Sequence, residues 1–139
     1  MNRTIKFRGK SIYGDGWLLG SLIKIEEDRY AVIPNLNDIE IGKSIGMYEV
    51  YPETVGQFTG LLDKDGKEIY EGDILHTITF GFNPEEYTAI ILYRNCSFQL
   101  SNGRNLFYFG QSDLTRMDDT IMIGNIHDNP ELINMKKSN

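Results

Sequence analysis

QFTGLLDKDGKEIYEGDIL, residues 57–75, is the stretch that decides the fold of this chain. Within it, three short apolar runs are separated by two tight turns. Residues 63–66 (DKDG) fit a type I turn ending in a left-handed residue, because aspartate accepts backbone N–H bonds there and glycine tolerates a positive φ. Residues 71–73 (EGD) predict a second reversal. Connections this short predict that the three strands are neighbours in one antiparallel sheet.

The same stretch is rich in carboxylates, which raises the question of a calcium loop. An EF-hand loop needs oxygen ligands at its first and twelfth positions around a central glycine. With Gly66 as that glycine, Leu61 takes the first position and Gly72 the twelfth, so the template fails at both ends. We therefore predict no metal and no other cofactor, and interpret the carboxylates as turn caps and solvated loop groups. They are Asp63, Asp65, Glu68, Glu71 and Asp73.

Composition indicates a mostly β protein with little helix. The chain has 139 residues, 40% of them hydrophobic, with 14 glycines, four prolines and many tyrosines and phenylalanines. These proportions favour short strands and tight turns. We predict a single domain over residues 1–139 with two lobes. Residues 1–52 form a β-meander, packed with a small SH3-like β-barrel at residues 53–139 that ends in a short helical turn after Asn129.

The N-terminal strand carries the most basic local surface. Residues 4–8 alternate, which predicts Ile5 and Phe7 on a buried face and Lys6 and Arg8 on a solvated one. A functional alternative is that this edge contacts an anion or nucleic acid. The net charge of −6 argues against nucleic acid, because phosphate neutralisation needs an excess of lysine and arginine. The candidate contact residues are Arg3, Lys6, Arg8 and Lys10.

One cysteine, Cys96, lies at the edge of an apolar strand, and we expect it to be a buried structural thiol. A chain with one cysteine forms no internal disulfide, which fits a reducing compartment. No window approaches the ~20 apolar residues of a membrane span. These features predict a soluble intracellular protein with no membrane partner.

Three further segments carry predictions. Residues 87–93 are the strongest β run and are apolar enough to be a central strand. Pro52 at the first position of residues 52–55 indicates one helical turn. At residues 107–109, Tyr108 lies opposite Phe107 and Phe109 if the segment is a strand, so it could be exposed for base stacking, although core packing is the simpler interpretation.

Catalytic patterns are missing. A nucleophile with a base needs serine, cysteine or threonine beside histidine, and neither His76 nor His127 lies in such a motif. Zinc sites use about four cysteine and histidine ligands in close pairs, and phosphate loops need a glycine-rich fingerprint before a helix. Neither pattern occurs here, so we predict that the protein is not an enzyme.

Four segments together resemble the YopX-like protein family of phages and prophages. They are the central stretch at residues 56–74, the opening IKFRGK at 5–10 with Gly16-Trp17, the PETV at 52–55 and the closing IGNIHDNPEL at 123–132. Their order and spacing agree with the family over essentially the whole chain. The resemblance implies a largely β protein and supplies no catalytic residues. Leu62 departs from the polar residue that many members have there.

The leading hypothesis is a non-enzymatic phage accessory protein, acting as a protein-binding or self-assembling β module. Its partner is then a second copy, in a homo-oligomer, or a host or phage protein. The alternative is a nucleic-acid-binding module that uses the basic N-terminal strand with exposed aromatic residues. A small hydrolase built on His76 or His127 is the third reading.

Overall fold

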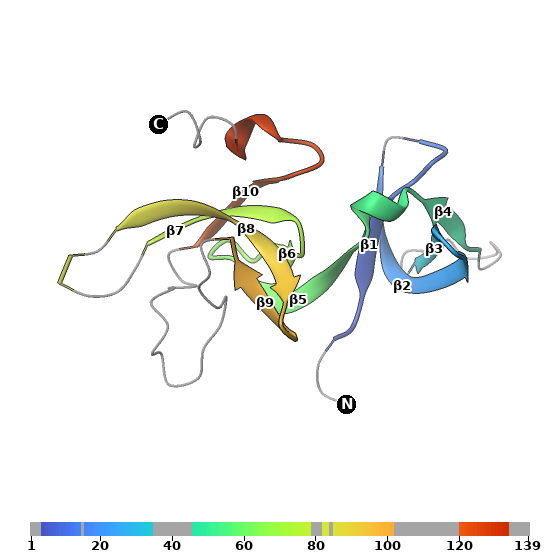
Figure 1. Cartoon of the computed structure of the whole chain (residues 1–139), viewed down its shortest axis with the longest axis horizontal. Helices are drawn as coiled ribbons and strands as arrows, with labels where there is room; N and C mark the ends of the chain where they lie inside the picture. The colour runs from blue at the N-terminus through green and yellow to red at the C-terminus, as the bar shows by residue number, and fades with distance from the viewer. Residues whose placement is uncertain are drawn as a thin grey trace. The chain divides into compact units, whose positions relative to one another are not determined.

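The computed structural model describes residues 4–14, 16–34, 46–78, 82–83, 85–101 and 120–133. Nearly all regular structure in these ranges is antiparallel β, which confirms the predicted mostly β fold with little helix (Figure 1). The chain forms two compact units, Met1–Phe58 and Thr59–Asn139. This division lies between Phe58 and Thr59, beyond the expected one after residue 52. The reason is that the chain after residue 52 continues into a strand whose first residues pair within unit 1.

Unit 1 is a meander of antiparallel strands. Strand β1 pairs with β2 on one side and with the first residues of β5 on the other. Strand β3 lies between β2 and β4 and pairs with both. A single 3₁₀ turn, η2, precedes β5 and begins with Pro52, as the sequence predicts. The elements are β1 (Phe7–Lys10), β2 (Trp17–Glu26), β3 (Arg29–Pro34), β4 (Tyr48–Val50), η2 (Pro52–Thr54) and β5 (Gly56–Leu62).

Strand β4 also bonds to the residues just after β1, which closes the strands of unit 1 into a ring. An isolated antiparallel bridge pairs Ser11 with Val50. On either side of it the Ile12 N–H donates to the Glu49 carbonyl over 3.1 Å, and the Tyr51 N–H donates to the Lys10 carbonyl over 2.9 Å. Each of β1 to β4 therefore has a neighbour on both sides along part of its length.

Two glycines permit this ring. A Cβ added at Gly9 lies 2.8 Å from both Cβ and Cγ2 of the fully buried Val50, closer than side-chain carbons approach. A Cβ at Gly20 collides with the backbone carbonyl of Ile33 on the neighbouring strand. Larger residues at these positions force the strands apart.

We expect Gly9→Ala to lower the free energy of unfolding by about 1–3 kcal/mol, because the added methyl overpacks the contact with Val50. Urea unfolding measures the change. Gly14→Ala is the matched control, since no atom lies within 4 Å of a Cβ added there. Equal stability of the two variants contradicts the packing argument.

Unit 2 contains a four-stranded antiparallel sheet of order β10-β7-β8-β9, and β6 lies beside β5. The predicted strand at residues 87–93 is β8, which is central because β7 and β9 flank it. The strands are β6 (Glu68–Tyr70), β7 (Asp73–Ile78), β8 (Glu86–Arg94), β9 (Ser97–Leu100) and β10 (Ile121–Asn125). After β10, residues 131–133 form the helical turn expected beyond Asn129.

The prediction that β5, β6 and β7 are consecutive neighbours was wrong for β7, which pairs with β8 and β10 instead of β6. The turn between β6 and β7 explains the difference. Gly72 has φ +94°, its N–H donates to the Ile91 carbonyl over 2.9 Å, and its carbonyl accepts from the Ile126 N–H over 3.0 Å. The Gly72 backbone is bonded to the chain at β8 and just after β10, so a β6–β7 hairpin does not form.

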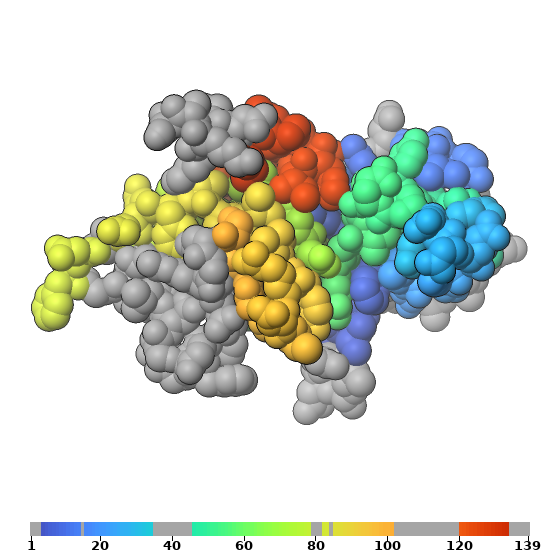
Figure 2. Space-filling model, viewed as in Figure 1, coloured from blue at the N-terminus to red at the C-terminus, as the bar shows by residue number. Residues whose placement is uncertain are grey.

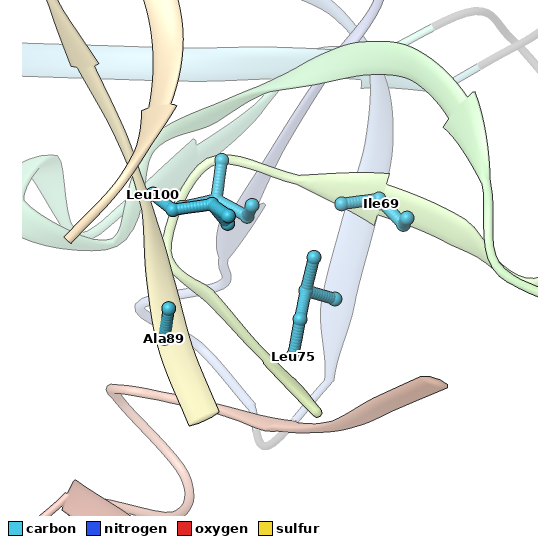
Figure 3. Close-up of a cluster of buried hydrophobic side chains, with 5 residues drawn as sticks. Ile69, Leu75, Ala89 and Leu100 are labelled. Carbon is cyan, nitrogen blue, oxygen red and sulfur yellow. The ribbon is translucent and has the colours of Figure 1, made fainter. Parts of the chain in front are cut away.

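A cluster of buried aliphatic side chains forms the core of unit 2. Ile69 from β6, Leu75 from β7, Ala89 from β8 and Leu100 from β9 point toward one another (Figure 3). Ile91 completes the cluster, and every member is at most 1% exposed. Four partly buried residues pack around it: Leu61, Tyr87, Phe98 and Met122.

The carboxylate of Asp63 joins the central turn to β10. Its Oδ1 accepts the N–H groups of Asp65 and Lys67 over 2.8 and 2.9 Å, and its Oδ2 accepts the Met122 N–H over 3.0 Å. Gly66 has φ +83° and donates to the Asp63 carbonyl, so the predicted turn over residues 63–66 is confirmed. Burial by itself raises the pKa of this carboxyl, but the N–H bonds from Met122, Lys67 and Asp65 outweigh burial and leave the pKa below its ordinary value.

We expect Asp63→Asn to lower the free energy of unfolding by about 1–3 kcal/mol at neutral pH, because an amide NH₂ replaces one acceptor oxygen and leaves a backbone N–H unsatisfied. The depressed folded pKa also gives a pH signature. The stabilising contribution of the Asp63 carboxylate is complete above the unfolded pKa of about 4 and disappears as pH falls through the folded pKa.

Urea unfolding measured from neutral pH to strongly acidic pH tests both effects. The variant should show a weaker acid dependence than the wild-type chain. Asp65→Asn is the control, since Asp65 is exposed and its backbone N–H, rather than its side chain, takes part in the turn. Identical acid dependence in wild type and Asp63→Asn contradicts this role.

Candidate protein-binding surface

The basic residues predicted as a contact edge lie against aromatic rings of their own unit. The guanidinium carbon of Arg8 is 4.5 Å from the Trp17 ring centroid, and the Lys10 ammonium is 5.9 Å from the same centroid. The Lys6 ammonium lies 5.3 Å from the Phe58 ring centroid. These are cation–π distances. Arg3, the fourth predicted member, lies outside the described residues.

The expected burial alternation of this strand was wrong. Arg8 is only 7% exposed, whereas Ile5 is 44% exposed. A planar guanidinium packs its faces on an indole, so Arg8 is buried on the side that was predicted to be solvated. Ile5 precedes the first residue of β1, Phe7, and so lies outside the strand on which the alternation depends.

The histidines lie in separate surroundings. His76 places Nδ1 3.4 Å from the Thr88 hydroxyl and Nε2 4.0 Å from a Glu86 carboxylate oxygen. The backbone N–H of His127 donates to the Asn125 side chain. Among the described residues, no group of three or more histidine, cysteine, aspartate or glutamate side chains is placed to hold a metal ion.

Cys96 is exposed, so the expectation of a buried thiol was wrong. It follows Asn95 in the two-residue turn between β8 and β9, and both residues have positive φ, +52° and +64°. This is the geometry of a type I′ hairpin turn. A residue at the tip of a hairpin points away from the sheet, which places the thiol outside the core.

The closing motif of the sequence is an asparagine-centred turn. The Asn125 Oδ1 accepts the N–H groups of His127 and Asp128, both over 2.9 Å, while the Asn129 Oδ1 accepts the Asn125 N–H over 3.2 Å. A Cβ at Gly124 lies 2.6 Å from that Asn129 oxygen. The described hydrogen bonds of this motif therefore fix the backbone of the turn, as the hydrogen bonds of Asp63 fix the turn at residues 63–66.

Unit 1 exposes a group of tyrosines that the sequence analysis did not single out. We define the tyrosine surface as Tyr13, Met47 and Tyr48, whose exposed fractions are 78%, 56% and 47%. Large apolar side chains scattered singly on a surface need no explanation, but a group on neighbouring segments does.

The ring closure of unit 1 places these residues together. Tyr13 follows Ile12 and Tyr48 precedes Glu49, so the two tyrosines flank the hydrogen bond between Ile12 and Glu49. Tyr51, three residues beyond Tyr48 on extended backbone, points to the opposite face of the segment and is not part of this surface. The segment that carries β4 and η2 lies on the visible face of unit 1 (Figure 2).

The charged side chains near this surface differ in their bonding and exposure. Arg29 donates from Nε and a terminal nitrogen to both carboxylate oxygens of Glu49, over 3.1 and 2.8 Å, and from its other terminal nitrogen to Glu26 over 2.8 Å. The bonds to Glu49 and then to Glu26 raise the pKa of Arg29, and the bond from Arg29 lowers the pKa of Glu49. Glu53, in η2 beside Tyr51, is exposed.

The architecture and its motifs match a known family. The family model described as YopX protein covers residues 6–134. The chain belongs to the YopX protein family. A solved structure similar to this YopX family member is the crystal structure of protein EF1440 from Enterococcus faecalis, at 28% sequence identity and a TM-score of 0.60. The match covers 95% of this chain and 99% of the EF1440 chain.

A comparison with curated proteins finds no match. Among the described residues of this YopX family member, no helix has the length and apolar character needed to cross a membrane.

Proposed function

We propose that this YopX family member is a non-enzymatic binding module that holds a segment of another protein on the tyrosine surface. The observation that carries the proposal is the exposure of two tyrosines and a methionine on two directly paired segments. Tyrosine and methionine are enriched in protein interfaces, and tyrosine buries a large area with few rotatable bonds.

Nucleic acid binding by the basic strand is the less supported alternative. The cations of that strand lie over Trp17 and Phe58, and Arg8 is nearly buried. The chain also carries a net charge of −6. Tyrosines stack on bases as well as on proteins, so the distinction is a matter for experiment.

The proposed setting is the cytoplasm of a bacterial host, with a phage or prophage origin. The resemblance of the sequence motifs supports the origin, and a single cysteine is compatible with a reducing compartment. The small SH3-like barrel expected at residues 53–139 stays a prediction. In a second form of the proposal, the tyrosine surface binds another copy of this chain in a homo-oligomer.

Selection of random linear peptides displayed against the immobilised full chain tests the proposal. We expect enriched peptides that bind the wild-type chain and lose about tenfold or more in affinity for Tyr13→Ala and Tyr48→Ala, since interface tyrosines commonly contribute more than 1 kcal/mol. The control is Tyr93→Ala, which removes a tyrosine of unit 2 that is 52% exposed. Circular dichroism verifies that each variant is folded.

Two further measurements decide between the alternatives. Light scattering of wild type and Tyr48→Ala reports whether the surface holds a second copy. Fluorescence anisotropy with short DNA and RNA at low and moderate salt reports phosphate contacts, whose affinity falls steeply with salt. A chain that enriches no peptide, stays monomeric and binds nucleic acid in a salt-sensitive way contradicts the proposal.

A further inference from the structure

We infer that the turn at residues 63–66 covers the outer edge of β10 and prevents this edge from pairing with β10 of a second copy of the chain. The contact is autoinhibitory, because it occupies backbone groups that a second strand needs for pairing. The inference concerns unit 2 and does not depend on the binding proposed for the tyrosine surface of unit 1.

Strand β10 lies at the edge of its sheet. Among the described residues it pairs with one strand, β7, and it ends the order β10-β7-β8-β9. The outer side of an edge strand carries backbone N–H and C=O groups that can pair with another chain. An edge of this kind therefore needs cover if the chain is not to associate through it.

Two backbone groups at β10 are bonded to the turn. The Met122 N–H donates to Asp63 Oδ2 over 3.0 Å, and the Thr120 carbonyl accepts the Lys64 N–H over 2.9 Å. Backbone groups of residues two apart on a strand point to the same side, so both of these groups face away from β7. The turn therefore takes the place of a neighbouring strand along this edge.

The side chain of Asp63 both shapes the turn and attaches it to β10. Its Oδ1 accepts the N–H groups of Asp65 and Lys67 over 2.8 and 2.9 Å, while its backbone carbonyl accepts the Gly66 N–H over 3.0 Å. The residue is 5% exposed. Loss of this one carboxylate therefore loosens the turn and uncovers the edge together.

The composition of β10 favours a second copy as the partner of the uncovered edge. Residues 120–126 (TIMIGNI) contain three isoleucines, no charged residue and no proline. Segments of about five to seven residues with high β propensity and low net charge pair readily with copies of themselves. Two antiparallel copies of this segment place no like charges opposite each other. Ile123 is already 41% exposed.

Two variants uncover the edge by different routes. Asp63→Asn leaves one acceptor oxygen for three N–H groups, so the bond to Met122 competes with the bonds that shape the turn. Lys64→Pro removes the N–H that donates to Thr120, and it keeps the turn because proline is favoured at the second position of a type I turn. Ile91→Val is the matched control, since it destabilises the core of unit 2 without altering the turn or β10.

Light scattering of the folded full-length chains at matched concentrations measures the association. We expect about twice the wild-type mass for Asp63→Asn and Lys64→Pro, because an isologous pair of strands closes at two copies, and the wild-type mass for Ile91→Val. Circular dichroism verifies that each variant is folded. If Asp63→Asn does not fold, Lys64→Pro alone decides the test.

A second substitution on β10 locates the contact. Adding Ile123→Lys to either variant should return the mass to the wild-type value, because a lysine on an edge strand opposes pairing. The lysine should not restore the stability lost in Asp63→Asn, so urea unfolding separates association from destabilisation. Adding Tyr48→Ala to Asp63→Asn should leave the increased mass unchanged.

Four outcomes contradict the inference. They are a wild-type mass for both turn variants, equal association of Ile91→Val, association that persists with Ile123→Lys, and association that Tyr48→Ala abolishes. The first three leave the proposed function of the tyrosine surface in place. The fourth assigns the self-association to the tyrosine surface instead of β10.

Discussion

Unit 1 depends on the antiparallel contact of Ser11 with Val50. Two backbone hydrogen bonds flank it, and the missing side chain of Gly9 lets Val50 come close enough for them to form. The contact closes the ring of strands, and it also brings the chain after β1 beside β4. The tyrosine surface exists because of that closure, since its members come from segments more than 30 residues apart in sequence.

The central and closing motifs of the family resemblance act on the backbone. Asp63 accepts three N–H groups and links its turn to β10, Gly72 bonds β8 to the chain after β10, and Asn125 organises the turn beyond that strand. Such roles demand particular residue types, because buried backbone groups need partners and tight turns need glycine. Membership of the YopX family therefore accounts for the fold, whereas the proposed binding surface uses residues outside the central and closing motifs.

The two candidate surfaces differ in what their side chains do. Lys6, Arg8 and Lys10 form cation–π contacts with Trp17 and Phe58, which use the charges within unit 1. The tyrosine surface exposes large amphipathic side chains beside Arg29, a cation already held by two carboxylates. The core of a protein interface is enriched in aromatic residues and depleted of charged ones. The exposed tyrosines therefore favour a protein partner over nucleic acid, in line with the negative net charge of the chain.

Local chemistry in the sequence determined the β class, the turn at residues 63–66, the 3₁₀ turn at Pro52 and the central strand β8. Each depends on residues close together in the chain, so turn propensity and apolar patterning suffice to predict it. Only the tertiary structure decided that β7 leaves β6, that Arg8 is buried, that Cys96 is exposed and that Tyr13 lies near Tyr48. These outcomes depend on partners distant in sequence: the Ile91 carbonyl for Gly72, the Trp17 ring for Arg8 and the β4 backbone for Ile12. A single sequence does not specify which distant groups meet, because that choice is made by packing of the whole unit.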